Sequence, residues 1–386
     1  MNIVTIIMAV FSIIAGLDRI FGNKLGLGKE FDKGFMLLGT MMLSMTGMIV
    51  ISPFIAELLE PLFSAIYSGL HVDPSIIPAS LFANDMGGAP LSVEVAKNAD
   101  VGLFNALVVS SMLGCTISFT IPFSLSAVEE RNRKELLVGI LCGMVTIPVG
   151  CFVAGLMVGL NIVVSLINLA IPVVLSALIA TGLMLAPNVC VKIFSAFGWF
   201  MKAIITVGLV LGGIGYLFDF TAMTASTNET IRAMGNFMMP LENFLAGLET
   251  MENAAMVCVN ASIVMSGAFP LVHIISKLLT KPLKKLGDLI GVNETSAMGL
   301  VSSLATSATT FEMTKRMDKK GIVLNCAFAV SGAFVFAGHL AFTLAFDQSY
   351  IFPMIVGKLV AGVTSIFVAM FIYKRIYSSK EKAKTE

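Results

Sequence analysis

The sequence predicts an all-α polytopic membrane protein with about nine transmembrane helices, two re-entrant hairpins and two inverted-topology repeats. Two observations are compositional: 57% of the 386 residues are hydrophobic and only 13% are charged. A typical soluble domain carries about 25% charged residues. The third observation is that apolar runs long enough to cross a bilayer recur along almost the whole chain. Cytosolic enzymes, secreted modules and disordered chains are thereby excluded.

Each candidate span is an apolar run of a length that suits a bilayer. In chain order the candidate spans are 3–20, 34–52, 102–127, 136–160, 161–186, 193–217, 252–275, 322–346 and 350–373. The first lacks a basic leader and a cleavage site, so we expect it to be retained. Two shorter segments, 75–97 and 294–314, are less apolar and rich in small or polar residues. We expect both to form re-entrant hairpins, because irregular backbone in a membrane must lie against protein or water.

The basic residues predict the orientation. They gather at 19–33, 131–134, 277–285, 315–320 and 374–384. All of these clusters are cytoplasmic if the first helix runs from outside to inside. The opposite connections are acidic: residues 53–74 contain Glu57, Glu60 and Asp73 but no Lys or Arg. We therefore expect an outer N-terminus and a cytoplasmic C-terminus.

The two halves of the chain resemble each other. Residues 138–146 match 356–364 as Val-Gly-x-Leu followed at the same spacing by Val-Thr. The charge map orients the opening helices of the two halves oppositely, which is typical of secondary transporters with a midplane substrate site. The expected regions are an N-terminal helix and loop (1–33), repeat one (34–160), linking helices and an exterior loop (161–251), repeat two (252–373) and a basic tail (374–386).

The first hairpin contains the candidate charge. Asn84 and Asp85 precede Gly87 and Gly88, and Pro90 discourages a continuous helix. A carboxylate in an apolar span is costly unless it has a partner or water. We expect these residues to bind substrate, with Asp85 as the counter-charge of a small cation. The alternative is a carboxylate that caps the helix of the hairpin.

Hydroxyl groups gather in the second hairpin, at Thr306, Ser307, Thr309 and Thr310. They suit a substrate hydroxyl or amine, or a dehydrated ion, and the alternative is that they satisfy the backbone of the hairpin. Asn325, on the helix that follows, is a further candidate for substrate binding. His339 lies on the same predicted span, about 21 Å away by the helical rise.

Three residues are candidates for gating or coupling. His339 suits a gate, or is a packed histidine near a span end. Lys358 lies within a span, where it either pairs with an intramembrane acid and switches with proton movement, or snorkels to the interface. Glu252 opens a helix together with Glu249, so it either collects cations at an entrance or is a solvated acid at a helix N-terminus.

No pattern points to a metal, a cofactor, nucleic acid or an enzyme. The 6 cysteines lie in apolar stretches without a CxxC pair, and the 3 histidines are far apart. No phosphate-binding loop or nucleophile elbow occurs in a suitable context. The net charge of +1 implies no nucleic acid partner.

Several motifs resemble one known family. They are Asn-Cys-Ala-Phe-Ala-Val-Ser at 325–331, Gly-His-Leu at 338–340, Phe-Pro-Met-Ile-Val-Gly-Lys at 352–358, Asp-Met-Gly-Gly at 85–88, and Thr-Ile-Pro at 146–148 with Gly-Cys at 150–151. Over nearly the whole chain the sequence is similar to the EutH-type ethanolamine-utilisation transporters. The resemblance implies a bacterial inner-membrane permease that admits ethanolamine to feed ethanolamine ammonia-lyase inside microcompartments.

Three functions remain open from the sequence. The first is a facilitator of ethanolamine in the lipid bilayer, with Asp85 facing the ammonium and Thr or Asn groups facing the hydroxyl; this architecture is compatible with a homo-oligomer. The second is an ion-coupled carrier of another small amine or a nucleoside-like solute. The third is a non-transporting sensor or anchor of the microcompartment, which would use the basic segments at 277–285 and 374–386.

Overall fold

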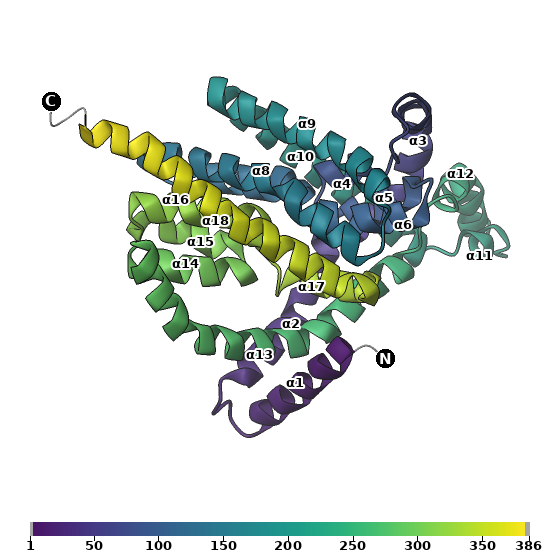
Figure 1. The fold of residues 1–386 in the computed structure, drawn as a ribbon. Coiled ribbons are helices and arrows are strands. Elements are labelled where there is room, and N and C mark those ends of the chain that lie inside the picture. Colours follow the sequence, from purple (N-terminus) through teal and green to yellow (C-terminus); the bar gives the residue numbers. More distant parts are fainter. Residues whose placement is uncertain (1–2, 383–386) are drawn as a thin grey trace.

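The computed structural model describes residues 3–382, apart from the side chains of 3–4, 187–188, 191, 275–276, 279–289, 345 and 377–382. Residues 383–386 of the expected basic tail lie outside the described residues. Within this range all regular elements are helices, which confirms the all-α class (Figure 1).

The first half contains four short helices and three π-helical stretches between longer helices. In chain order its elements are α1 (Ile3–Ile20), α2 (Leu27–Met41), η1 (Met42–Thr46), α3 (Gly47–Leu70), α4 (Ile76–Leu81), η2 (Asn84–Met86), α5 (Gly88–Val95), α6 (Ala99–Phe104), η3 (Asn105–Gly114), η4 (Thr116–Thr120), α7 (Ile121–Ala127), η5 (Glu130–Asn132) and α8 (Arg133–Met157). Of these, η1, η3 and η4 are π-helical.

The rest of the chain continues with long helices and a second set of short ones. These elements are α9 (Ile162–Leu185), α10 (Pro187–Leu217), α11 (Phe220–Thr224), α12 (Glu229–Leu245), α13 (Met251–Ile290), α14 (Glu294–Ala305), α15 (Ser307–Met313), η6 (Thr314–Arg316), α16 (Lys319–Gly332), α17 (Gly338–Phe346), η7 (Gln348–Tyr350) and α18 (Ile351–Lys382).

Among the described residues, 7 helical stretches are long and apolar enough to cross a membrane. They are Leu27–Leu70, Ala99–Ala127, Glu130–Met157, Ile162–Leu185, Lys192–Leu217, Met251–Ile274 and Gln348–Ile376. These coincide with all but two of the expected spans. The first exception, 3–20, is the 18-residue helix α1, which packs against α2 and α13. The chain is therefore a multi-pass membrane protein.

The second exception corrects the prediction of one continuous span at 322–346. The helix ends at Gly332 and resumes at Gly338, so Asn325 and His339 do not share a helix. Between the two, Phe334 has a φ of 60°. A positive φ is unusual for a bulky residue, so surrounding contacts must hold this backbone in place.

Those contacts come from the end of α14. The backbone N–H groups of Phe334 and Phe336 donate to the carbonyl oxygens of Ser303 and Leu304, both at 3.0 Å. The last carbonyls of a helix have no partner within it. The break at 333–337 supplies these partners, and it thereby ties the second hairpin to α16 and α17.

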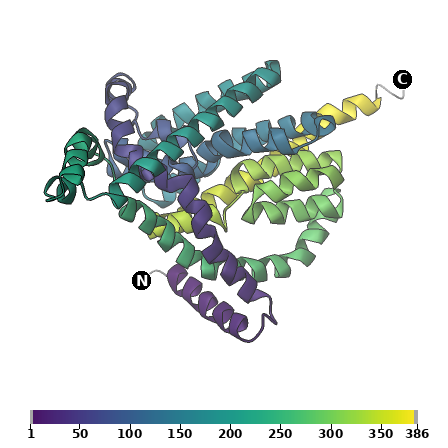
Figure 2. The ribbon, with the colours of Figure 1, turned by 180° about the vertical axis from the view of Figure 1, so that it is seen from behind.

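Two stretches outside the expected spans are helical. α13 continues as one 40-residue helix to Ile290 and so includes the basic cluster at 277–285; this helix forms a curved edge of the molecule (Figure 1). The expected exterior loop at 218–250 contains α11 and α12, which project from the remaining helices in both views. Figure 2 shows α2 and α3 crossing the face opposite to that of Figure 1.

Both segments expected as hairpins are pairs of short helices that begin in the same way. In the first, the Asp73 carboxylate accepts hydrogen bonds from the backbone N–H (3.0 Å) and hydroxyl (2.5 Å) of Ser75. In the second, the Asn293 side-chain oxygen accepts the same two bonds from Ser296, at 2.9 and 2.7 Å. These side-chain bonds satisfy amides that a helix start leaves free.

The helices that follow the two pairs are also capped alike. The side-chain oxygen of Asn98 accepts a bond from the N–H of Val101 at 3.1 Å. Asp318 accepts the equivalent bond from Gly321, also at 3.1 Å. The two halves therefore share local hydrogen bonding as well as the sequence matches at 138–146 and 356–364.

Small residues allow α8 to approach both α16 and α18. Gly139 and Gly143 face α16, and Gly150 faces Gly357 of α18 so closely that an added methyl group would overlap its carbonyl oxygen. Thr146 bridges the same pair of helices by donating to the Ala361 carbonyl at 2.9 Å. Close backbone approach through small residues is a common way to pack helices in a membrane.

We expect Gly150→Ala to lower the unfolding free energy by about 1–3 kcal/mol, because the new methyl group overpacks the α8–α18 contact. Thermal unfolding of the purified protein in detergent measures the change. The matched control is Gly213→Ala in α10, where a methyl group meets no atom within 4 Å. Equal melting temperatures for the two variants would contradict the close contact.

Candidate functional site

Asp85 lies where the first helix pair is interrupted. α4 ends at Leu81, η2 carries Asp85, and α5 begins after Gly87, whose φ of 94° is unfavourable for residues with a side chain. A methyl group at Gly87 would also overlap the Met48 side chain. The Asp85 side chain keeps 30% exposure although Asn84 beside it is fully buried. The Asp85 side chain is therefore partly accessible, whereas its neighbour is enclosed by protein.

The break after α16 brings His339 to this carboxylate. Nε2 of His339 lies 3.9 Å from Oδ1 of Asp85, beyond the length of a hydrogen bond. The imidazole is buried, and its Nδ1 has no hydrogen-bond partner among the described residues. A methyl group at Gly338 would come within 3.2 Å of the other Asp85 oxygen. The missing side chain at 338 thus keeps this side of the carboxylate open.

Asn84 adds an amide next to the carboxylate. Its side chain is fully buried, yet neither its amide nitrogen nor its amide oxygen has a hydrogen-bond partner in the described part of the chain. Buried polar atoms are nearly always bonded to protein, water or ligand. Two adjacent residues thus carry an enclosed amide without a described partner and a partly exposed negative charge.

The π-helix η3 and its continuation η4 hold the interrupted backbone. Ser110 donates its hydroxyl hydrogen to the Phe82 carbonyl at 2.8 Å, and the N–H of Ala83 donates to the Ser118 hydroxyl at 3.0 Å. These bonds satisfy backbone groups that the gap between α4 and α5 leaves without helical partners. π-Helical segments are often found at functional sites.

Lys358 is buried in α18, with 1% exposure. Its Nζ donates to the Ser111 carbonyl of η3 at 2.6 Å. The prediction that Lys358 snorkels is therefore wrong, because the side chain points into the protein and reaches no interface. The other alternative, pairing with an intramembrane acid, stays a prediction.

The hydroxyls of the second hairpin differ in their surroundings. Thr306 caps α15 by accepting a bond from its second N–H at 3.3 Å. Thr310 donates to the Gly299 carbonyl at 3.0 Å. The Ser307 hydroxyl is buried without a partner in the described residues, whereas Thr309 is exposed. Thr306 and Thr310 thus satisfy the backbone of their own hairpin, and substrate contact by all four stays a prediction.

A series of aromatic rings joins the two interrupted segments. The His339 ring contacts Phe334 at a centroid distance of 5.2 Å, Phe334 contacts Phe119 at 5.4 Å, Phe119 contacts Phe123 at 5.3 Å, and Phe123 contacts Phe311 of α15 at 6.3 Å. The sequence reasoning missed Phe334. The glycines that bound its segment, at 332 and 338, were the available signal.

Two buried asparagines anchor the hairpins from the helices that follow. Asn105 donates to the Ser75 hydroxyl at 2.8 Å and exchanges two amide bonds with Asn168, at 2.6 and 3.1 Å. Asn325 donates to the Ser296 carbonyl at 2.8 Å and to a carbonyl of its own helix at 2.9 Å. Its Oδ1 has no described partner. Asn325 therefore joins α16 to α14, and its contact with substrate stays a prediction.

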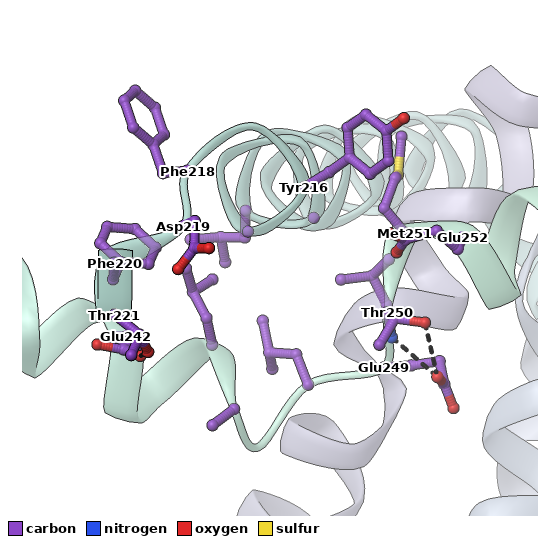
Figure 3. Close-up of a pocket in the computed structure, with 17 residues that line it drawn as sticks. Tyr216, Phe218, Asp219, Phe220, Thr221, Glu242, Glu249, Thr250, Met251 and Glu252 are labelled. Atoms are coloured by element: carbon purple, nitrogen blue, oxygen red, sulfur yellow. Dashed lines mark hydrogen bonds between the residues drawn. The ribbon is translucent and has the colours of Figure 1, made fainter. Parts of the chain in front are cut away.

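A hollow of about 280 Å³ lies near the starts of α11 and α13 (Figure 3). Its labelled acidic residues are Asp219, Glu242, Glu249 and Glu252. Glu249 accepts bonds from the N–H of Thr250 at 2.8 Å and from a nearby Asn amide at 3.0 Å. Glu249 thus acts as a helix-end acid, while Glu252 is exposed at the rim.

Comparison with known proteins decides the family. The family model described as "Ethanolamine utilisation protein, EutH" matches residues 1–372. The chain belongs to the EutH family. A "Probable ethanolamine permease EutH" of Listeria monocytogenes is 39% identical over 387 residues, covering 100% of this chain and 97% of that protein. The resemblance predicted from the motifs is confirmed.

Other EutH-like relatives also cover the chain. A "Probable ethanolamine permease EutH" of Salmonella typhimurium is 35% identical over 414 residues, with 100% of this chain and 98% of that protein covered. The "Uncharacterized protein YxeR" of Bacillus subtilis is 36% identical over 370 residues, covering 96% and 94%. No solved structure matches. The permease names imply a family of transporters rather than enzymes.

We expect Asn325→Ala to reduce stability by about 1–3 kcal/mol, because it removes a buried amide and with it the bond that joins α16 to the Ser296 carbonyl of α14. Thermal unfolding in detergent measures the loss of stability. Thr309→Ala, at an exposed position of the hairpin that Asn325 anchors, is the control. An Asn325→Ala protein as stable as the control would show that the anchor is unimportant.

Proposed function

We propose that this EutH-family protein carries ethanolamine across the bacterial inner membrane and feeds its catabolism. The observation that carries the proposal is the pair at the first break: a partly exposed carboxylate at Asp85 beside the buried amide of Asn84, which has no partner among the described residues. The names of the relatives give the substrate class, and this pair gives the chemistry that would recognise it.

Ethanolamine matches that pair group by group. At neutral pH its amine is mostly protonated, so the ammonium would bond to Asp85 with a strong, charge-assisted hydrogen bond. Its hydroxyl lies two carbons away and both donates and accepts, as the Asn84 amide does. An intramembrane carboxylate is costly without a partner, and the substrate would provide one.

We further propose that the chain forms two inverted repeats, 34–160 and 252–373, with both hairpins re-entrant and the N-terminus outside. The matching bonds at Asp73 and Asn293, and the matching caps at Asn98 and Asp318, support the repeat. With α1 and the interrupted α16–α17 pair added, the count of spans becomes nine. Transporters of this kind place discontinuous helices at the midplane site.

The remaining candidates fit around this site. The aromatic rings from His339 to Phe311 lie between Asp85 and the second hairpin, where they would act as a gate. Glu252, at the exposed rim of the outer hollow, would attract cations to the entrance. Substrate contacts by Thr309 and Ser307 would then follow the opening of the gate.

We expect Asp85→Asn to reduce uptake of labelled ethanolamine by roughly ten- to a hundred-fold, because a hydrogen bond to a charged group contributes about 1.5–3 kcal/mol. Uptake is measured in proteoliposomes at mildly acidic pH, where little neutral amine leaks through lipid. Asp100→Asn, an exposed acid in α6, is the matched control.

Saturable wild-type uptake that Asp85→Asn leaves unchanged would make Asp85 structural. Wild-type uptake no greater than that of empty liposomes would refute ethanolamine transport.

Asn84→Ala tests recognition of the hydroxyl. A site that bonds a hydroxyl discriminates against analogues that lack it. We expect the preference for ethanolamine over ethylamine, measured by competition against labelled ethanolamine, to fall about three- to ten-fold. Ser126→Ala, an exposed hydroxyl near the end of α7, is the control. An unchanged preference in a folded Asn84→Ala protein would assign the hydroxyl to another residue.

A further inference from the structure

We infer that Lys358 is the internal counter-cation of the empty site: its ammonium balances Asp85 when no substrate is bound and allows the carrier to reorient empty. This inference rests on the proposed function, since it assumes that an ammonium binds at Asp85. Binding of a small cation at Asp85 does not by itself require Lys358, so the inference gives this lysine a role of its own.

The position of Lys358 needs an explanation. The side chain is 1% exposed within a membrane-spanning helix, and at the matching position of the first half the residue is Ile140. In the described part of the chain its hydrogen bond goes to the neutral carbonyl of Ser111. A buried ammonium bonded to a single carbonyl is poorly compensated, so intramembrane lysines normally have a functional partner.

Asp85 is that partner by position. Lys358 bonds to Ser111, and the adjacent Ser110 bonds to Phe82, three residues before Asp85. One short stretch of η3 therefore holds both the lysine and the interrupted hairpin. In the described residues no ion pair at contact distance joins Lys358 to Asp85, whose nearest titratable neighbour is His339 at 3.9 Å. The Asp85 side chain keeps 30% exposure, so another cation could still reach the carboxylate.

The other titratable groups around Lys358 do not replace Asp85. Cys115 of the η3–η4 junction and Cys151 of α8 are buried thiols, and His339 contributes an imidazole without negative charge. Of these groups, Asp85 is the one that carries a carboxylate. Together the two side chains carry no net charge.

A carrier of a single ammonium must return without it. An uncompensated carboxylate opposes that return, because its negative charge would have to stay buried in low dielectric. With Lys358 near, the empty site is balanced, and the incoming ammonium competes with Lys358 for Asp85. A variant without the lysine charge would bind the substrate more tightly. Reorientation of its empty form would be less favourable than in the wild type.

The test compares two transport modes in proteoliposomes. Exchange of labelled for unlabelled ethanolamine requires only the loaded carrier to reorient, whereas net uptake into empty vesicles requires the empty carrier to return. We expect Lys358→Gln, which keeps a donor for Ser111 but no charge, to retain exchange within about two-fold and to lose net uptake about ten-fold or more. Lys358→Arg restores the charge and should restore net uptake.

Binding gives a second readout. Ethanolamine should raise the melting temperature of Lys358→Gln at lower concentrations than it needs for the wild type, because the competing ammonium is gone. Lys358→Met serves the same comparisons if the Gln variant does not fold.

Parallel loss of both modes in a folded variant, or retention of both, would overturn the inference. Absence of exchange in the wild type would instead refute ethanolamine transport. The two failures are therefore distinguishable.

Discussion

The structure depends on one constraint: inside a membrane, each backbone polar group and each charge must find its partner within the protein. Continuous helices meet this requirement locally, but the chain departs from them at the first hairpin, at η3 and at 333–337. In each case a neighbouring break supplies the missing bonds. Serines of the π-helical region bond to the backbone around Phe82, and the carbonyl ends of α14 bond to the turn at Phe334.

Because each break in the helices forms hydrogen bonds with another segment, polar groups from both halves of the chain lie near each other. The turn after α16 directs His339 toward Asp85, and α18 brings Lys358 to the π-helix that supports the same hairpin. A carboxylate, an imidazole and an ammonium are thus brought to one region from three separated segments. Their mutual electrostatics, rather than any one residue, would decide how a small cation binds there.

Much of the site could be predicted from the sequence. A carboxylate followed by two glycines in an apolar span marked the first break, because charge and flexible backbone are both costly in lipid. The break at 333–337 was not predictable in the same way. Its residues are apolar, no proline interrupts it, and the φ of Phe334 is maintained by α14, which is distant in sequence. Similarly, the burial of Lys358 depends on the packing of α18, so the sequence left pairing and snorkelling equally open. The helical class, the family and seven spans followed from composition and motifs, whereas hydrogen-bond partners required the fold.

The glycine contact between α8 and α18 has a mechanical consequence. At Gly150 and Gly357 the backbones of α8 and α18 lie against each other, and the side chains closest to this point are those of alanines. Turning one helix against the other at this point requires little repacking, whereas pulling them apart breaks the bond from Thr146 to Ala361. Since these are the closing helices of the two proposed repeats, the seam is suited to serve as the pivot about which one half of the protein rocks against the other.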